Sequence, residues 1–364
     1  MYTESDLEAA IAAGAISPEA ADAFRNHAAG ARATPAIDEE HFRLLTGFND
    51  IFVSIAAVIL LVAVGWIGQS IRLTLDQGAP SPFAGAFIAA TAWGLAEFFT
   101  RKRRMALPSI ILLLAFVGGV FGTSIGLAAT IISEQTVRNN ESLIALIASV
   151  CAAVAAAGAY VHWRRFRVPI TVAAGAAAVV GVALGLIAYA IGDTPNLENF
   201  ILGFALLLGI GVFLFAMWWD SSDPTRQTRR SDVAFWLHLL SAPLIVHPVF
   251  ALLGLTDGNA STMEAVIVLL LYVGLGFTAL AIDRRALLVS ALAYVLYALS
   301  SLFREYGAVE LNMALTALVI GSALLLLSAF WHTARRGVVN TLPGALRSKL
   351  PVLDRSVVSP RPAS

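Results

Sequence analysis

Residues 107–132 read LPSIILLLAFVGGVFGTSIGLAATII, an apolar run without a charged side chain. At the rise of an α-helix, about 20 such residues cross the hydrocarbon core of a bilayer. The run is continuously apolar and does not alternate, so it favours a membrane-spanning helix over a strand of a membrane barrel. The sequence therefore predicts an integral membrane protein of the all-α class.

Comparable apolar runs recur along the 364 residues, about ten in all. They lie near 50–68, 82–100, 107–132, 142–162, 168–192, 198–219, 231–255, 263–282, 286–303 and 310–332. The composition agrees, because 58% of the residues are hydrophobic and only 13% are charged, against about 25% charged residues in a typical soluble domain. The expected fold is a polytopic transmembrane helical bundle of about ten spans.

The overall charge argues against nucleic acid as a partner, because 24 Lys and Arg balance 24 Asp and Glu. The single cysteine, Cys151, allows neither a disulfide framework nor a cysteine-based zinc or iron–sulfur site. Motifs of nucleotide-binding loops, zinc proteases, serine hydrolases and kinases are absent from the sequence. We therefore expect no cofactor, no metal and no soluble-type enzymatic activity.

Basic residues gather in alternate loops, which predicts the orientation. All of them except Arg72, Arg138 and Arg304 fall on one side of the predicted spans, together with both termini. Cytoplasmic loops retain Lys and Arg, so both termini are expected in the cytoplasm. The short outer loops and this charge bias favour a bacterial inner membrane.

The chain divides into three predicted regions. They are a cytoplasmic helical hairpin with a juxtamembrane helix (1–48), the transmembrane bundle (49–333), and a cytoplasmic tail with a short interfacial helix before a disordered end (334–364). The hairpin helices begin at Thr3 and Ser17 and end at Gly14 and Gly30. The hairpin either rests on the cytoplasmic loops or docks a protein partner through residues 3–29.

The seventh predicted span, which begins SDVAFWLHLLSAPLIVHPVF (231–250), is the strongest candidate for a ligand or proton site. Its candidate residues are His238, Ser241, Pro243, His247 and Pro248. Each proline lacks an N–H and crowds the carbonyl four residues before it, which frees the carbonyls of Leu239 and Leu244. A broken helix of this kind is typical of ligand sites in transporters.

Three interpretations of this span stay open. The first is a structural kink whose freed carbonyls find partners in Ser241 and neighbouring helices. The second is a site for a transported substrate or a proton relay, and the third is a haem or metal site. Nine residues separate the two histidines, so a straight helix places them on opposite faces. Haem would need a second axial ligand, and the other span histidines, His162 and His332, are expected at cytoplasmic ends.

Other charged residues in or near the spans are few. Glu97 precedes Arg101 by one turn, and this spacing fits either an interfacial ion pair or a proton or cation site. Asp220, Asp232 and Asp283 lie beside arginines at cytoplasmic ends. We expect these three to form salt bridges of loops or helix caps.

Small residues at every fourth position predict close helix packing in the third and fifth spans. The predicted packing seams contain Gly118, Gly122, Gly126, Gly181 and Gly185. A glycine-lined pathway is the alternative. Tyr294 and Tyr297 give the ninth span a polar edge that could face the seventh.

The hairpin sequence DLEAAIAAGAISPEAADAF (6–24), followed by many Ala- and Leu-rich spans, resembles uncharacterised bacterial multi-pass membrane proteins of the domain-of-unknown-function kind. The span number is also similar to that of ten-span drug/metabolite exporters, although the N-terminal extension departs from their pattern. These resemblances imply no particular site residue. We expect a permease or exporter for a small solute or ion. The alternative is a non-catalytic scaffold or regulator that recruits a cytoplasmic partner through residues 3–29.

Overall fold

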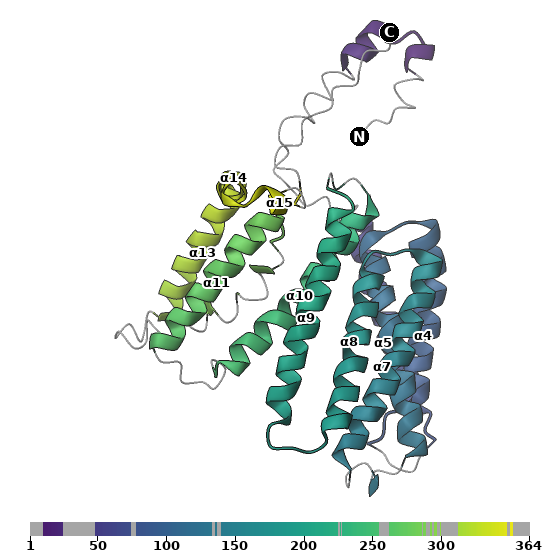
Figure 1. The fold of residues 1–364 in the computed structure, drawn as a ribbon. Coiled ribbons are helices and arrows are strands. Elements are labelled where there is room, and N and C mark those ends of the chain that lie inside the picture. The colour runs from purple at the N-terminus through teal and green to yellow at the C-terminus, as the bar shows by residue number, and fades with distance from the viewer. Residues whose placement is uncertain are drawn as a thin grey trace. The chain divides into compact units, whose positions relative to one another are not determined.

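The computed structural model describes residues 10–24, 48–73, 78–132, 135–136, 140–224, 226, 228–254, 262–285, 287–288, 292, 295–296, 299, 312–347 and 350–351. Within these residues every regular element is a helix and none is a strand, which confirms the all-helical class for this part of the chain (Figure 1). The chain forms two compact units, Met1–Arg43 with Asp354–Ser364, and Leu44–Leu353.

The larger unit contains all the long helices. Their bounds are α3 Phe48–Ser70, α4 Pro82–Ala96, the π-helix η1 Glu97–Lys102, α5 Ala106–Ile131, α7 Glu141–Phe166, α8 Ile170–Ile191, α9 Leu197–Ser221, α10 Arg229–Leu252, α11 Thr262–Ile282, α13 Asn312–Ala329, α14 Trp331–Thr341 and α15 Gly344–Arg347. Seven described helices are long and apolar enough to cross a membrane, and the bent pair α13–α14 would make eight. The ninth predicted span, 286–303, lies mostly outside the described residues.

Helix starts follow from local capping. The Ser81 hydroxyl accepts a hydrogen bond from the N–H of Phe83. Pro82 occupies the first turn of α4, where a backbone N–H would have no acceptor within the helix, so the missing N–H of proline costs nothing. The Asn140 side chain accepts a hydrogen bond from the N–H of Leu143 at the start of α7. These caps explain why the apolar runs become helices with sharp beginnings.

Helices α4 and α5 pack closely because glycines bring their backbones together. A Cβ added at Gly85 would overlap the carbonyl oxygen of Gly119, and one at Gly126 would come within 2.5 Å of the Pro82 nitrogen. Such contacts between backbones are the usual role of small residues in membrane helices.

The first glycine of the packing seam predicted for the third span is wrong by one residue, because Gly119 and not Gly118 makes the contact. An added Cβ would meet nothing within 4 Å at Gly118, whereas the adjacent Gly119 faces Gly85 and Ala89 of α4. Gly122 makes only an ordinary contact, 3.8 Å from an added Cβ to the Gly85 Cα. The helical rotation of about 100° per residue explains why the neighbouring glycine takes the contact.

The fifth predicted span, now α8, packs against α7 in the same way. At Gly185 an added Cβ would lie 2.8 Å from the carbonyl oxygen of Ala145. At Gly181 it would lie 3.6 Å from the Cβ of Ala152, an ordinary van der Waals distance. Gly185 is therefore the position where α7 and α8 come closest among these glycines.

The tenth predicted span, 310–332, ends earlier than expected. Helix α13 stops at Ala329, and the chain bends by 76° into α14. The reason is polarity, because α14 begins WHTARR and could not continue through hydrocarbon. Its residues Trp331, Arg335 and Val339 repeat every four positions and are buried, which is typical of an amphipathic helix on a surface.

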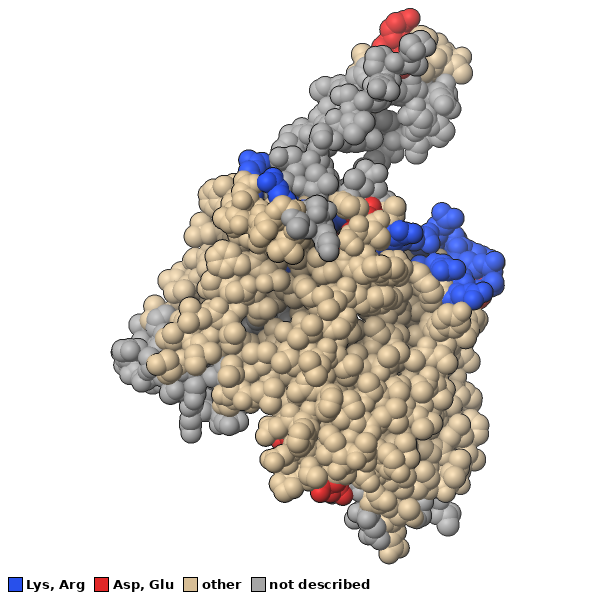
Figure 2. All heavy atoms as spheres, viewed as in Figure 1, with Lys and Arg blue, Asp and Glu red and all other residues tan. Residues whose placement is uncertain are grey.

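Basic residues of the larger unit gather at one end of the helices. Figure 2 shows a cluster of Lys and Arg over the ends of α4 and α7, and further Lys and Arg over α14. The cluster corresponds to the basic runs 101–104 and 164–167. These loops were predicted to share one side, and which compartment this end faces stays a prediction.

The smaller unit is described over residues 10–24. A helical turn ends at Gly14, whose φ of 70° is the left-handed conformation that glycine adopts without strain. The next helix begins after Ser17, whose hydroxyl accepts a hydrogen bond from the N–H of Ala20. The turn of the predicted hairpin therefore lies where the sequence places it.

Candidate functional site

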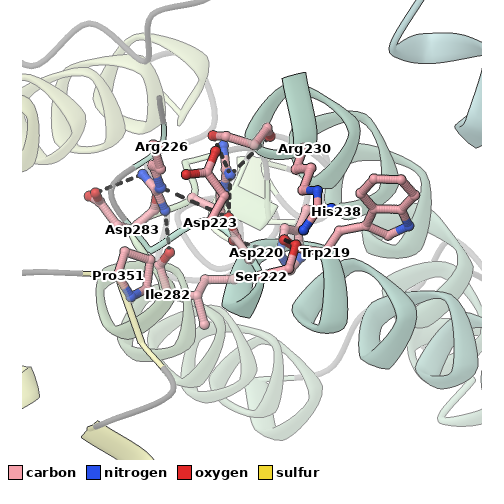
Figure 3. A network of polar contacts seen from close by, with 12 residues as sticks. Trp219, Asp220, Ser222, Asp223, Arg226, Arg230, His238, Ile282, Asp283 and Pro351 are labelled. Atoms are coloured by element: carbon pink, nitrogen blue, oxygen red, sulfur yellow. Dashed lines mark hydrogen bonds and ion pairs between the residues drawn. The ribbon is translucent and has the colours of Figure 1, made fainter. Parts of the chain in front are cut away.

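Asp220 lies in the last turn of α9 and is only 2% exposed. A short connection returns the chain into α10, so the end of α9 faces the first turns of α10. The Nε2 atom of His238 lies 3.3 Å from the Asp220 Oδ2 atom, and the histidine ring is fully buried (Figure 3). An Asp–His pair therefore joins the two helices inside the protein.

Arg284 binds the same carboxylate from a different part of the chain. It follows α11, is 2% exposed, and donates from Nη2 to Oδ1 of Asp220 at 2.6 Å and from Nε to Oδ2 at 3.2 Å. Its Nη2 also donates to the carbonyl oxygen of Ser231 at 3.2 Å. This two-pronged pairing is the strongest geometry for an arginine and a carboxylate.

A second buried carboxylate lies beside the first. Asp283 ends α11 with a φ of 57°, the left-handed conformation common after helices. Its carboxylate accepts hydrogen bonds from Arg226 Nη1 at 2.9 Å and from the indole Nε1 of Trp331 at 2.8 Å. Arg335 Nε lies 3.6 Å from the same carboxylate. The end of α11 is thus held by two arginines and a tryptophan.

Arg226 connects the two carboxylates. Its Nε lies 3.9 Å from Asp220 Oδ1, and its Nη2 donates to the carbonyl oxygen of Ile282 at 2.9 Å (Figure 3). That carbonyl belongs to the last turn of α11, where helices leave acceptors unsatisfied. We call the connected residues the polar network: Asp220, Arg226, His238, Asp283, Arg284, Trp331 and Arg335.

Local structure on both sides holds the polar network in place. The Asp223 carboxylate accepts hydrogen bonds from the N–H of Thr228 at 2.8 Å and from its hydroxyl at 2.7 Å, which fixes the connection between α9 and α10. Thr228 in turn caps α10, because its hydroxyl accepts a hydrogen bond from the N–H of Arg230. Arg335 donates to the carbonyl oxygen of Pro351 at 2.7 Å.

The polar network contains two carboxylates and three guanidinium groups, so it carries a net charge of +1 with a neutral histidine. Burial alone would raise the pKa of the Asp283 carboxyl, but Arg226 and Arg335 hold this pKa below its usual range. Taking such ions out of water costs several kcal/mol per ion before their attraction is counted. A neutral apolar junction would avoid this cost.

The structure brings together only part of the predicted site on α10. His238 and Ser241 are fully buried, and the Ser241 hydroxyl donates to the His238 carbonyl oxygen at 3.0 Å. Pro248 is also buried, whereas Pro243 and His247 are exposed. The two histidines therefore lie in different surroundings, and a shared haem or metal between them does not fit this helix.

The carbonyl of Leu244, freed by Pro248, faces a glycine of the neighbouring helix. A Cβ added at Gly209 of α9 would come within 2.8 Å of the Leu244 carbonyl oxygen. Figure 1 shows the later part of α10 bending away from α9. Gly209 thus leaves room for the Leu244 carbonyl where α9 and α10 are in contact.

Glu97, at the start of the π-helix η1, forms an ion pair with two arginines. It accepts from Arg101 Nη1 at 3.2 Å and from Arg165 Nε at 2.7 Å. The Glu97 side chain is 32% exposed and that of Arg165 43% exposed. Glu97 thus forms partly exposed ion pairs, and their position at a membrane interface stays a prediction. Tyr294 and Tyr297, the other secondary candidates, lie outside the described residues.

The sequence predicted salt bridges or caps for Asp220 and Asp283, and the structure shows salt bridges of both, but these are buried between helices. Both are buried and both lie beside Arg226, which is 57 residues from Asp283, and Asp220 also binds Arg284, which is 64 residues away. One signal was present, because Asp220 directly follows Trp218 and Trp219 at the end of an apolar run. The pairing with Arg284 requires the tertiary fold and left no local pattern.

An apolar groove lies between α10 and α11, beyond the polar network. Its volume is about 420 Å³, and its lining includes Val249, Phe250, Leu271, Gly274 and Thr278. Among the described residues, no group of three or more His, Cys, Asp and Glu side chains could hold a metal ion.

No protein-family model, no curated protein and no solved structure matches the chain. The polar network and the groove between α10 and α11 are therefore the features that bear on its function.

Proposed function

We propose that the chain is a membrane permease or exporter for a small solute or ion, and that the polar network forms its gate at one end of the helices. The observation that carries this proposal is that two carboxylates and three arginine side chains, each less than 10% exposed, lie where α9 and α10 meet the ends of α11 and α13. The wider proposal includes about ten spans and both termini in the cytoplasm of a bacterial inner membrane.

The cost of the polar network supports a functional role. Replacing a buried ion pair by apolar residues of similar size is often neutral or stabilising. Ionisable residues within membrane bundles commonly mark the paths of ions and protons. The five buried charges at this junction are therefore better explained by a role in conformational change or ion transport than by a contribution to folding stability.

The arrangement of the charges suits a gate. Asp220 and His238 belong to α9 and α10, whereas Arg284 follows α11. Ion pairs that cross between two groups of helices can exchange partners when those groups move. Arg226 already contacts both carboxylates, at 3.9 Å from Asp220 and 2.9 Å from Asp283. A small displacement of α11 would transfer it from one to the other.

His238 gives this gate a way to respond to protons. Its Nε2 faces Asp220, and its Nδ1 is buried without a hydrogen-bond partner among the described residues. A histidine that gains a proton would compete with Arg284 for the Asp220 carboxylate. We therefore propose the proton as the coupling ion, with the groove between α10 and α11 as part of the solute route.

Cysteine labelling tests the route without knowledge of the solute. On a Cys151→Ala background, single cysteines replace Val249 and Thr278 in the groove, with Leu214→Cys on the exposed face of α9 as the control. A membrane-impermeant maleimide is applied to intact cells and to inverted vesicles. We expect the groove cysteines to react and the Leu214→Cys control to stay unlabelled.

The gate is tested by adding Asp220→Asn to the same cysteine variants. Loss of this carboxylate should open the end that holds the polar network, so labelling of Thr278→Cys should rise from that side. Groove cysteines that stay unreactive from both sides, in a folded protein whose Lys102→Cys loop control reacts, would contradict the permease.

The scaffold remains the second candidate, because residues 1–43 belong to a separate compact unit. Deleting residues 3–29 distinguishes the two functions. A permease should keep the labelling pattern of its groove cysteines after the deletion. A scaffold should show no groove labelling before it and should lose a specific co-purifying protein after it.

A further inference from the structure

A second, smaller pocket lies between α11 and α13 and is distinct from the groove. Its volume is about 130 Å³, and its lining includes Tyr272, Arg285, Leu288, Leu324, Leu327 and Trp331. Almost all of this lining is apolar. The pocket therefore suits a hydrocarbon chain better than a soluble molecule.

One end of this pocket is cationic and lies where the helices end. Arg285 follows α11, Trp331 begins α14, and the guanidinium carbon lies 4.8 Å from the centre of the indole ring. Arg285 forms no ion pair with a carboxylate in the part of the chain that the structure describes. The face of the Trp331 ring lies against this charge and stabilises it.

The tryptophan at this end is held rigidly. Its indole Nε1 donates to the Asp283 carboxylate at 2.8 Å, and the side chain is only 2% exposed. Because the nitrogen is fixed, the ring presents a constant face to Arg285. The cationic end of the pocket is therefore preorganised.

A polar group in the pocket also lacks a partner. The Tyr272 hydroxyl is buried and makes no hydrogen bond to any of the residues that the structure describes. Buried hydroxyls normally form a hydrogen bond, because leaving one without a partner is energetically costly. A ligand with an acceptor oxygen near the apolar chain would remove this cost.

The surroundings place the pocket at the surface of a bilayer. Helix α14 turns 76° from α13 and begins with aromatic and basic residues, the composition of a helix at the level of lipid headgroups. On α13, Leu325 and Leu326 are 74% and 59% exposed and stand beside the lining residues Leu324 and Leu327. The apolar part of the pocket is thus open to acyl chains.

We infer that this pocket binds one anionic phospholipid of the adjacent leaflet. The lipid phosphate pairs with Arg285, an ester oxygen accepts from the Tyr272 hydroxyl, and an acyl chain lies between α11 and α13. A free phosphate ion would contact one guanidinium and otherwise apolar side chains. A phospholipid can bind to both, because its acyl chain contacts the apolar lining, so we favour the lipid as the source of the anion. This inference holds whether or not the chain transports a solute.

Native mass spectrometry of the full-length protein tests the inference. The purified protein is exchanged into equal amounts of phosphatidylglycerol and phosphatidylcholine, and retained lipids are counted as detergent is removed. We expect one phosphatidylglycerol to be retained in preference to phosphatidylcholine. The Arg285→Gln variant should lower this preference about tenfold, whereas Arg336→Gln, which removes an exposed cation of α14, should leave it unchanged.

Filling the pocket provides an independent test. Leu324→Trp should reduce retention of both lipids at this site, because the larger side chain occupies the space of the acyl chain. If that variant does not fold, Leu327→Phe serves the same purpose, and the melting temperature establishes folding for each. Equal retention of the two lipids by the unaltered protein would overturn the inference. So would unchanged preference in Arg285→Gln, or displacement of the lipid by millimolar inorganic phosphate.

Discussion

At the scale of single residues, burial separates two acidic side chains that look alike in the sequence. Glu97 and Asp220 both lie at the ends of apolar helices beside arginines. The Glu97 side chain is 32% exposed, whereas that of Asp220 is 1% exposed. An exposed pair contributes little, but a buried charge that loses its partner is strongly destabilising.

The variant Asp220→Asn leaves Arg284 buried without a charged partner. We expect a loss of about 3–5 kcal/mol of folding free energy, seen as a fall of several degrees in the melting temperature of the detergent-purified protein. Glu97→Gln is the matched control and should melt close to the unaltered protein. Similar melting temperatures for both variants would show that the Asp220 carboxylate does not stabilise the fold by pairing with Arg284.

Gly209 permits the close approach of α9 to the freed carbonyl of Leu244. Gly209→Ala should therefore separate the two helices and cost about 1–3 kcal/mol, the usual range for overpacking. Gly211→Ala is the control, because an added Cβ there meets no atom within 4 Å. Melting temperatures report the difference, and a Gly209→Ala variant as stable as Gly211→Ala would contradict this packing.

Residue-level sequence reasoning identified His238 and Ser241 because histidine and proline are rare inside apolar spans. It could not identify Arg284 as the partner of Asp220, because 64 residues separate them. Because arginines follow Asp220 closely in the sequence, a salt bridge within the loop was predicted for it instead. Sequence spacing predicts contacts within one helix turn, while contacts between helices depend on rotation and depth.

At the scale of the elements, helix positions follow the apolar runs closely. The predicted spans 198–219 and 231–255 became α9 Leu197–Ser221 and α10 Arg229–Leu252. Hydrocarbon length and capping residues determine such bounds locally. The bend between α13 and α14 was missed, because the aromatic residues Phe330 and Trp331 extend the apolar run past the true helix end.

The bend of α10 leads to a prediction about the groove. Pro243→Ala restores an N–H that can bond to the Leu239 carbonyl, so α10 should straighten. We expect labelling of Thr278→Cys by an impermeant maleimide to slow several-fold. Pro82→Ala is the control, because Pro82 lies in the first turn of α4 and removes no helical hydrogen bond. Equal labelling rates would show that Pro243 does not shape the groove.

At the scale of the whole molecule, the polar network makes stability depend on pH. The pKa of Asp283 is held low in the folded protein, so its charge stabilises the fold above the unfolded value of about 4 and this contribution is lost as pH falls below it. The melting temperature should therefore fall between pH 5 and pH 3. The Asp283→Asn variant should show a flatter profile, and an unchanged slope would contradict this origin.

The proposed orientation is also a property of the whole chain. Cysteines at Arg103 and Arg229, which lie at the basic end, should react with an impermeant maleimide only in inverted vesicles. A cysteine at Asn196, at the opposite end of α9, should react only in intact cells. Reaction of Arg103→Cys and Asn196→Cys from the same side would refute the arrangement of these spans.

Trp331 belongs to both the polar network and the lipid pocket. Its nitrogen holds Asp283, while its ring faces Arg285. Any event that shifts the indole at one site alters the free energy of the other, and such coupling is reciprocal. A change in the anionic lipid content of the bilayer would then act as an effector of the gate, and the protein would sense the composition of the membrane in which it lies.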